Sequence, residues 1–322
     1  WWLGRLAGDA GRGLGEWASE PERPLLATAC GCLASFLLHW LGYRLAVHRV
    51  GWPAPLFAPT EWEGRTGWRK PLVFGISTAM VFVSLRQGLR AQRLVPRALV
   101  SHLAAWSAAV EVAIITLQAW RGVPSHFNTS TTLDAALYAA KLLCVVALSA
   151  ACLAVTAGVL RGASRLAPER ACALRHGLPM LCLSAAIGFV QVAYGHSGRS
   201  GRPEEAARCL EVTAGAAGSP CYEVHGQAAV KLAHFLPLHA TELLLLLAWA
   251  AAHARGGQPL RLVQAAAAAC WCLSLLGILL TVRGEDIRKP ETPGAGAAVA
   301  ASLTCVAATF VVAYLAPLAQ RA

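Results

Sequence analysis

The chain has 322 residues, of which 56% are hydrophobic and only 14% are charged, and its mean hydropathy is +0.50. Soluble domains carry about 25% charged residues, so this composition excludes an ordinary soluble fold. The net charge of +11 does not indicate nucleic-acid binding, because the basic residues lie in short segments between apolar stretches and no soluble domain is left to present them.

Eight apolar stretches follow one another, and most of them have the roughly 20 residues that a helix needs to cross a bilayer. They lack the strict alternation that β-barrel strands require. We therefore predict a single integral membrane domain over residues 1–322, an all-α polytopic bundle of the plasma membrane or an endomembrane with lipid around it. The predicted spans cover residues 25–46, 71–86, 98–120, 133–160, 176–195, 229–254, 260–282 and 295–318.

The first span carries His39 and stands between two polar segments. Residues 1–24 are interpreted as a polar lead at the membrane interface. Residues 47–70 are rich in Trp and Pro, which is typical of a loop at the level of the headgroups. The second span begins at Pro71, a residue type favoured in the first turn of a helix.

The third span carries a polar stripe. At 100° per residue, Glu111 and Gln118 lie about 20° apart and Arg121 about 60° further round. Ionisable groups inside a membrane helix cost about 2.5–3.5 kcal/mol each, so a stripe of this kind indicates a face turned toward the protein interior. The connection to the fourth span and that span itself add further polar side chains: Ser125, His126, Asn128, Asp134 and Lys141.

The segment 196–228 is predicted to be a second extracytoplasmic loop, and its Cys209 and Cys221 are expected to form a disulfide. The sixth span follows and contains Pro237, which removes one helical hydrogen bond and frees the carbonyl of Ala233. Its ionisable residues are Lys231, His234, His239 and Glu242.

Arginine counts predict that both termini are cytoplasmic. Four arginines lie at the end of span two and in its connection to span three, and four lie between spans four and five, whereas the connection between spans three and four holds only Arg121. Basic loops stay in the cytoplasm. The sequon at Asn128 and the Cys209–Cys221 pair both fall on the predicted outer side, in agreement with this orientation.

With this orientation the polar residues of separate spans collect in the outer half of the bilayer, and we expect them to line one shared site. Imidazoles near carboxylates suit a transition metal or haem iron, in a redox or hydrolytic role. The predicted metal ligands are His39, His126, His234 and His239. The predicted catalytic residues are Glu111, His126, Asp134 and Glu242. The predicted polar contacts to a ligand are Gln118, Arg121, Ser125, Asn128, Lys141 and Lys231.

Three alternatives stay open. The pathway of a small-molecule or proton-linked transporter could be lined by Glu111, Arg121, Lys141, Lys231 and Glu242. The chain could be a non-catalytic subunit of a membrane complex or homo-oligomer, because its Ala- and Gly-rich spans favour tight helix contacts. The same side chains are also compatible with structural hydrogen bonds and ion pairs between helices.

Three motifs resemble a family of uncharacterised multi-pass bacterial membrane proteins. They are Lys70-Pro71-Leu72-Val73-Phe74-Gly75-Ile76-Ser77, the segment Gln118 to Asn128 with Arg121 and Ser125-His126, and Ala233-His234-Phe235 with His239. This resemblance implies a polytopic fold and supplies no activity. A weaker resemblance is to membrane-embedded zinc hydrolases of the alkaline ceramidase type, on Ser125, His126, Asp134, His234 and His239. It implies a zinc-held water, although His234 and His239 lie about 140° apart on a regular helix.

Overall fold

The computed structural model describes residues 20–47, 68–162, 166–197, 224–225, 228–253 and 258–319. Eight helices in these ranges are long and apolar enough to cross a membrane, and the fold is a polytopic helix bundle as predicted. The helices are α3 (Arg23–Val47), α4 (Arg69–Ala91), α5 (Arg97–Trp120), α6 (Thr132–Gly162), α7 (Pro168–Ser197), α9 (Val230–Leu238), α10 (Ala240–His253), α11 (Pro259–Val282) and α12 (Pro293–Ala319). Helices α9 and α10 together make the sixth span.

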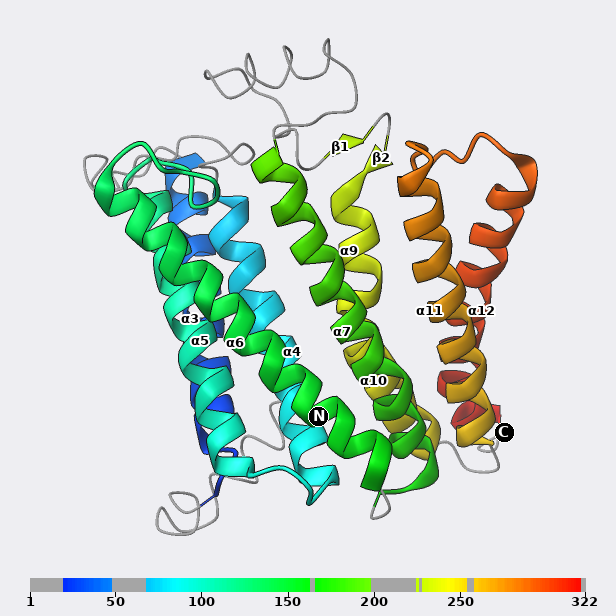
Figure 1. The fold of residues 1–322 in the computed structure, drawn as a ribbon. Coiled ribbons are helices and arrows are strands. Elements are labelled where there is room, and N and C mark those ends of the chain that lie inside the picture. Colours follow the sequence, from blue (N-terminus) through cyan, green and yellow to red (C-terminus); the bar gives the residue numbers. More distant parts are fainter. Residues whose placement is uncertain are drawn as a thin grey trace.

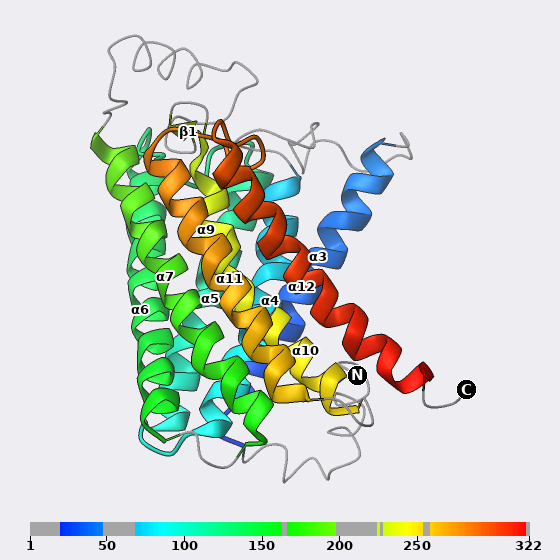
Figure 2. The same cartoon turned by 90° about the vertical axis from the view of Figure 1, so that its right-hand side faces the viewer.

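The bundle consists of two groups of helices that meet along α6 and α7 (Figure 1). Helices α3 to α6 form one group, and α7 packs with α9 to α12 in the other. At the free edge of the bundle, α3 and α12 tilt in opposite directions (Figure 2). Each group has its own hydrophobic core, one around Leu85 and Phe82 of α4 and the other around Leu247 of α10 and Val263 of α11.

Glycines allow two of the helix crossings to be close. A Cβ atom on Gly75 of α4 would lie 2.8 Å from the carbonyl oxygen of Cys32 in α3. A Cβ atom on Gly177 of α7 would lie 2.5 Å from the Cα atom of Thr241 in α10. Only a residue without a side chain fits at these crossings, so Gly75 fixes α3 against one face of α4.

Helix α4 is longer than the predicted span 71–86, because its last turns carry arginines that make ion pairs instead of ending the helix. Arg86 and Arg90 lie 3.0 and 2.6 Å from a carboxylate oxygen of Glu20. Glu22, which is almost fully buried, pairs with Arg97 at the start of α5. Helix α7 also begins earlier than the predicted residue 176, at Pro168.

The first described residue of α3 and the last turn of α12 lie at the same end of the bundle, the lower end in Figure 1. This agrees with an even number of crossings, and the cytoplasmic placement of that end stays a prediction. The opposite, upper end carries the loop 121–131 and a short antiparallel pairing of β1 (Val224–His225) with β2 (Ala228–Ala229). Most of the predicted interfacial lead 1–24, most of the predicted loops 47–70 and 196–228, and the Cys209–Cys221 pair lie outside the described residues.

Candidate functional site

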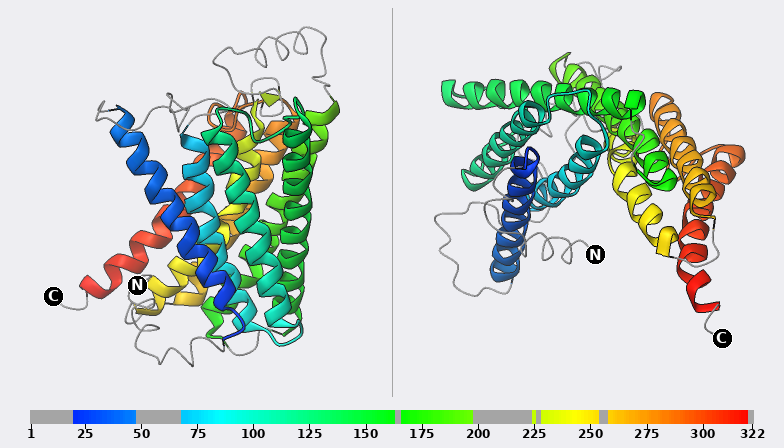
Figure 3. Two further views of the ribbon diagram at one scale, coloured as in Figure 1. Left: turned by 90° about the vertical axis from the view of Figure 1, so that its left-hand side faces the viewer. Right: turned by 90° about the horizontal axis from the view of Figure 1, so that it is seen from below.

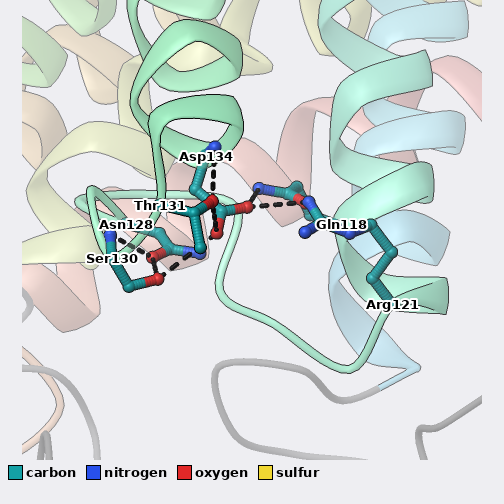
Figure 4. Close-up of polar contacts among 6 residues, drawn as sticks. All are labelled: Gln118, Arg121, Asn128, Ser130, Thr131 and Asp134. Atoms are coloured by element: carbon teal, nitrogen blue, oxygen red, sulfur yellow. Dashed lines mark hydrogen bonds and ion pairs between the residues drawn. The ribbon is translucent and has the colours of Figure 1, made fainter.

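A polar network closes the upper end of the bundle between α5 and α6 (Figure 4). Asp134, which is 2% exposed, accepts hydrogen bonds at one oxygen from Gln118 at 3.0 Å and from Arg121 at 2.7 Å. Its other oxygen accepts a bond from Thr131 at 2.7 Å. Three residues of the predicted site are thus brought together. Gln118, Arg121 and Asp134 use their hydrogen-bonding groups on one another. Arg121 forms its ion pair with Asp134 and not with Glu111.

The loop 121–131 is held down onto the bundle by a buried lysine. The amine of Lys141 on α6, 1% exposed, donates a hydrogen bond of 2.8 Å to the carbonyl of Ser125. Next to it, the ring of His126 lies 6.1 Å from the ring of Phe74 on α4, between ring centroids. Phe127 adopts a positive φ of 55° and packs its ring 5.5 Å from Tyr138. A non-glycine residue in this conformation is uncommon, and here the ring packing on both sides fixes it.

Asn128 of the sequon belongs to this loop and is 8% exposed. Its side-chain oxygen accepts hydrogen bonds from the backbone N–H and the hydroxyl of Ser130. In this conformation the side chain stabilises the turn, and it is too buried to carry a glycan.

Glu111 on α5 lies deeper in the bundle and interacts electrostatically with Lys141 and with Lys70 of α4. These three ionisable groups come from three helices; Lys70 is not among the residues predicted for the site, and the shared site stays a prediction. The side chain of Lys231 lies outside the described residues.

The four predicted metal-ligand histidines have different partners. His39 is 1% exposed and uses both ring nitrogens, since Nδ1 donates to the carbonyl of Ser35 at 2.6 Å and Nε2 accepts from the indole of Trp120 at 3.1 Å. The hydroxyl of Ser125 lies 3.1 Å from Nδ1 of His126. Throughout the described ranges, no three His, Cys, Asp or Glu side chains are placed to hold a metal ion. A metal or haem at these histidines therefore gains no support and stays a prediction.

His234 on α9 is bonded to α7 by two reciprocal hydrogen bonds. Its Nδ1 donates to the carbonyl of Ser184 at 2.8 Å, and the hydroxyl of Ser184 donates to the carbonyl of His234 at 2.8 Å. Ser184 is fully buried. The hydroxyl of Ser184 also lies 3.0 Å from Nδ1 of His234, so this serine–histidine pair joins two helices through the side chains and the backbone carbonyls of both residues.

His239 points to a different helix because the sixth span breaks at this residue. Pro237 has no N–H, and its ring clashes with a regular helical turn, so α9 ends at Leu238 and α10 begins at Ala240. The carbonyl of His239 accepts the first hydrogen bond of α10, from Leu243 at 3.2 Å. The imidazole consequently turns toward α4.

Ser77, His239 and Glu242 form a chain of contacts between α4 and the start of α10. The hydroxyl of Ser77 lies 2.9 Å from Nε2 of His239, and the other ring nitrogen, Nδ1, lies 3.5 Å from a carboxylate oxygen of Glu242. Neither oxygen of Glu242 has a hydrogen-bond partner within the described residues, although both are buried. Buried polar atoms are nearly always paired, so an unpaired carboxylate directed at an imidazole is a feature that requires an explanation.

This arrangement has the order of a nucleophile, a general base and an orienting acid. An ionised carboxylate only accepts hydrogen bonds, so Glu242 favours the tautomer with the proton on Nδ1. Nε2 then carries the lone pair that accepts the proton of Ser77. At 3.5 Å this contact is longer than an ordinary hydrogen bond, and Nδ1 of His239 has no hydrogen-bond partner within the described residues. A serine, an imidazole and a carboxylate in this order are the groups that acyl transfer at a serine uses.

The sequence analysis identified His239 and Glu242 but not Ser77 as site residues. The signal for Ser77 was its place at the end of the motif that begins at Lys70, seven residues earlier. Two helical turns separate these residues, so they lie within about 20° on one face of α4. A serine in an apolar helix has no other distinguishing pattern, because its partner is set by the packing of α4 on α10.

Comparisons of this chain with protein-family models, with curated proteins and with solved structures give no match. Evidence for a function therefore comes from the geometry of the side chains alone.

Proposed function

We propose that this multi-pass membrane protein is a serine hydrolase that cleaves acyl esters at Ser77. The observation that carries the proposal is the contact chain from the Ser77 hydroxyl through His239 to the buried, otherwise unpaired carboxylate of Glu242. Three separate features support it: the base touches the nucleophile through the correct nitrogen, the acid faces the opposite nitrogen, and 31% of the His239 side chain remains exposed beside Ser77.

The reaction proceeds in two balanced halves. Ser77 Oγ forms a bond to the acyl carbon while its proton passes to Nε2 of His239. The bond from the acyl carbon to the alcohol oxygen then breaks, and the alcohol leaves with that proton. A water molecule next gives its proton to Nε2 and attacks the acyl-serine; the carboxylic acid leaves, and the proton returns to Ser77. Glu242 stabilises the imidazolium that forms in each half.

The proposal keeps the hydrolytic interpretation of the sequence but replaces a metal-held water by a serine nucleophile. His126 and His234 have serine or backbone partners of their own, away from the Ser77 contact. No additional ligand is needed for His239 to act, because its two nitrogens already face the groups that a triad requires.

Labelling of the full chain in detergent micelles with diisopropyl fluorophosphate tests the proposal. This reagent phosphorylates activated serines, so the wild type should be labelled and should hydrolyse para-nitrophenyl esters, whereas Ser77→Ala should do neither. The matched control is Ser84→Ala, because Ser84 lies on the same face of α4 two turns further on and is buried. It should retain both activities.

Equal labelling and hydrolysis in the wild type and in Ser77→Ala, with all proteins eluting as one symmetric species, would overturn the proposal. Solute flux in proteoliposomes that depends on Glu111 and not on Ser77 would instead favour the transport alternative.

A further inference from the structure

We infer that the acyl substrate is dissolved in the membrane and reaches Ser77 sideways from the lipid, between α3 and α10. This inference rests on the proposed function. It concerns the chemical class of the substrate, which would be an ester with a long apolar chain and not a small water-soluble ester.

Ser77 lies well inside the second candidate membrane span, Arg69–Ala91. It is eight residues into α4, which corresponds to about 12 Å of helix from Arg69. His239, the last residue before α10, is nine residues beyond the start of α9 and lies at a similar depth. A substrate must therefore come down through the protein from the upper end or enter through the side of the bundle.

Side chains of the loop 121–131 and of α4 lie between Ser77 and the upper end of the bundle. Phe74 is three residues closer to the upper end than Ser77 and about 60° round the helix, and its ring meets the ring of His126 from the loop 121–131. Lys141 ties this loop to α6 through the carbonyl of Ser125. Phe127 and Tyr138 pack beneath the same loop. These contacts lie between Ser77 and the upper end and obstruct a bulky acyl chain there, whereas the water of the second half-reaction needs far less room.

The side of α4 next to Ser77 is open instead. Val73 lies about 40° from Ser77 round the helix and is 36% exposed, and Ile76 on the same side is 37% exposed. Ser77 itself is only partly buried, and the imidazole of His239 keeps 31% of its surface exposed at this depth. An exposed imidazole at the depth of lipid chains is costly unless it serves a ligand that arrives there.

Among the described residues, α3 and α10 flank this exposed surface of α4. Gly75, about 160° from Ser77, holds α3 against the opposite face of α4, and His239 brings the start of α10 to the Ser77 face. Viewed along the helices, α3 and α10 lie on either side of α4 (Figure 3, right). The exposed surface between them presents Val73 and Ile76, which are apolar, so the group that passes there is an acyl chain.

Obstruction of the side route tests the inference. In the variant Val73→Trp/Ile76→Trp, hydrolysis of para-nitrophenyl palmitate in mixed micelles should fall at least about tenfold, because a substrate held away from the nucleophile cannot react. Phosphorylation of Ser77 by the small reagent diisopropyl fluorophosphate should stay within about twofold of the wild type, since the triad is unchanged. The control Leu143→Trp, at an exposed position on α6, should change neither rate.

The outcomes separate the two proposals. Labelled Ser77 together with wild-type palmitate hydrolysis in the double tryptophan variant would overturn sideways access and leave the hydrolase intact. A wild type that cleaves para-nitrophenyl acetate faster than the palmitate would also overturn it. Absence of any Ser77 labelling in the wild type would overturn the proposed function itself.

Discussion

Two serine–histidine pairs join helices in this bundle, and they differ in what the hydrogen bonds leave free. In the Ser184–His234 pair, the hydroxyl lies 3.0 Å from Nδ1, each of these two groups also contacts a backbone carbonyl, and the serine is fully buried. In the Ser77–His239 pair, the hydroxyl meets Nε2 directly, and the second nitrogen faces the carboxylate of Glu242. The same two residue types thus connect helices in both places, and the pair that we propose as nucleophile and base is the one whose second ring nitrogen faces a carboxylate.

The difference comes from the backbone around each histidine. His234 lies inside α9, where a neighbouring helix offers it a carbonyl. His239 lies at the break that Pro237 causes, so its ring is directed at α4 and a glutamate follows one turn later. The proline therefore decides which histidine can act as a base.

The largest effect in this comparison is expected from His239→Gln. Glutamine can still bond to Ser77, but it cannot take up its proton, so ester hydrolysis should fall by about a thousandfold or more. The measurement is the steady-state rate per folded molecule in micelles. Retention of more than about a tenth of the wild-type rate would show that His239 is not the base.

A smaller loss is expected from Glu242→Gln. This change keeps the shape and an acceptor for Nδ1 but removes the negative charge that stabilises the imidazolium, so kcat should fall about a hundredfold with little change in KM. Glu111→Gln is the control, because it removes a buried carboxylate that interacts with Lys141 and Lys70 instead. If the two variants lose activity equally, Glu242 has no specific role in catalysis.

The smallest effect on turnover is expected from Ser184→Ala. Loss of the buried hydroxyl leaves the carbonyl of His234 without this donor, which should lower the free energy of unfolding by about 1–3 kcal/mol. The rate per folded molecule should remain that of the wild type. Denaturant unfolding in micelles measures the first quantity; a selective loss of rate at unchanged stability would contradict a purely structural role for this pair.

Hydropathy alone was enough to predict the eight spans, because each apolar stretch must satisfy its backbone hydrogen bonds as a helix in lipid. The predicted second span ended too early, because Arg86 and Arg90 are typical of a loop. Their ion pairs with Glu20 keep these residues in α4. Side-chain contacts between helices could not be predicted from the sequence for the same reason. The bond from Trp120 to His39 and the contact of Ser77 with His239 depend on how α3, α4, α5 and α10 cross.

The residue types of the candidate site were partly predictable. Intramembrane His239 and Glu242 are costly in lipid, so their presence alone indicated a protein interior or a function. Glu111 is ten residues from Arg121, about 15 Å along the helix, and the fold of the loop 121–131 brings Asp134 to Arg121 instead. One shared site was expected, whereas the structure gives the Asp134 network, the Lys141 contact and the Ser77 chain separate sets of partners.

The most direct measurement is the position of the phosphoryl group after diisopropyl fluorophosphate treatment of the wild-type chain, determined by mass spectrometry of its peptides. We predict a single adduct on the peptide that contains Ser77, and its loss in His239→Gln. An adduct at Ser184 or at another serine, or an unmodified Ser77 in protein that still hydrolyses esters, would contradict the account.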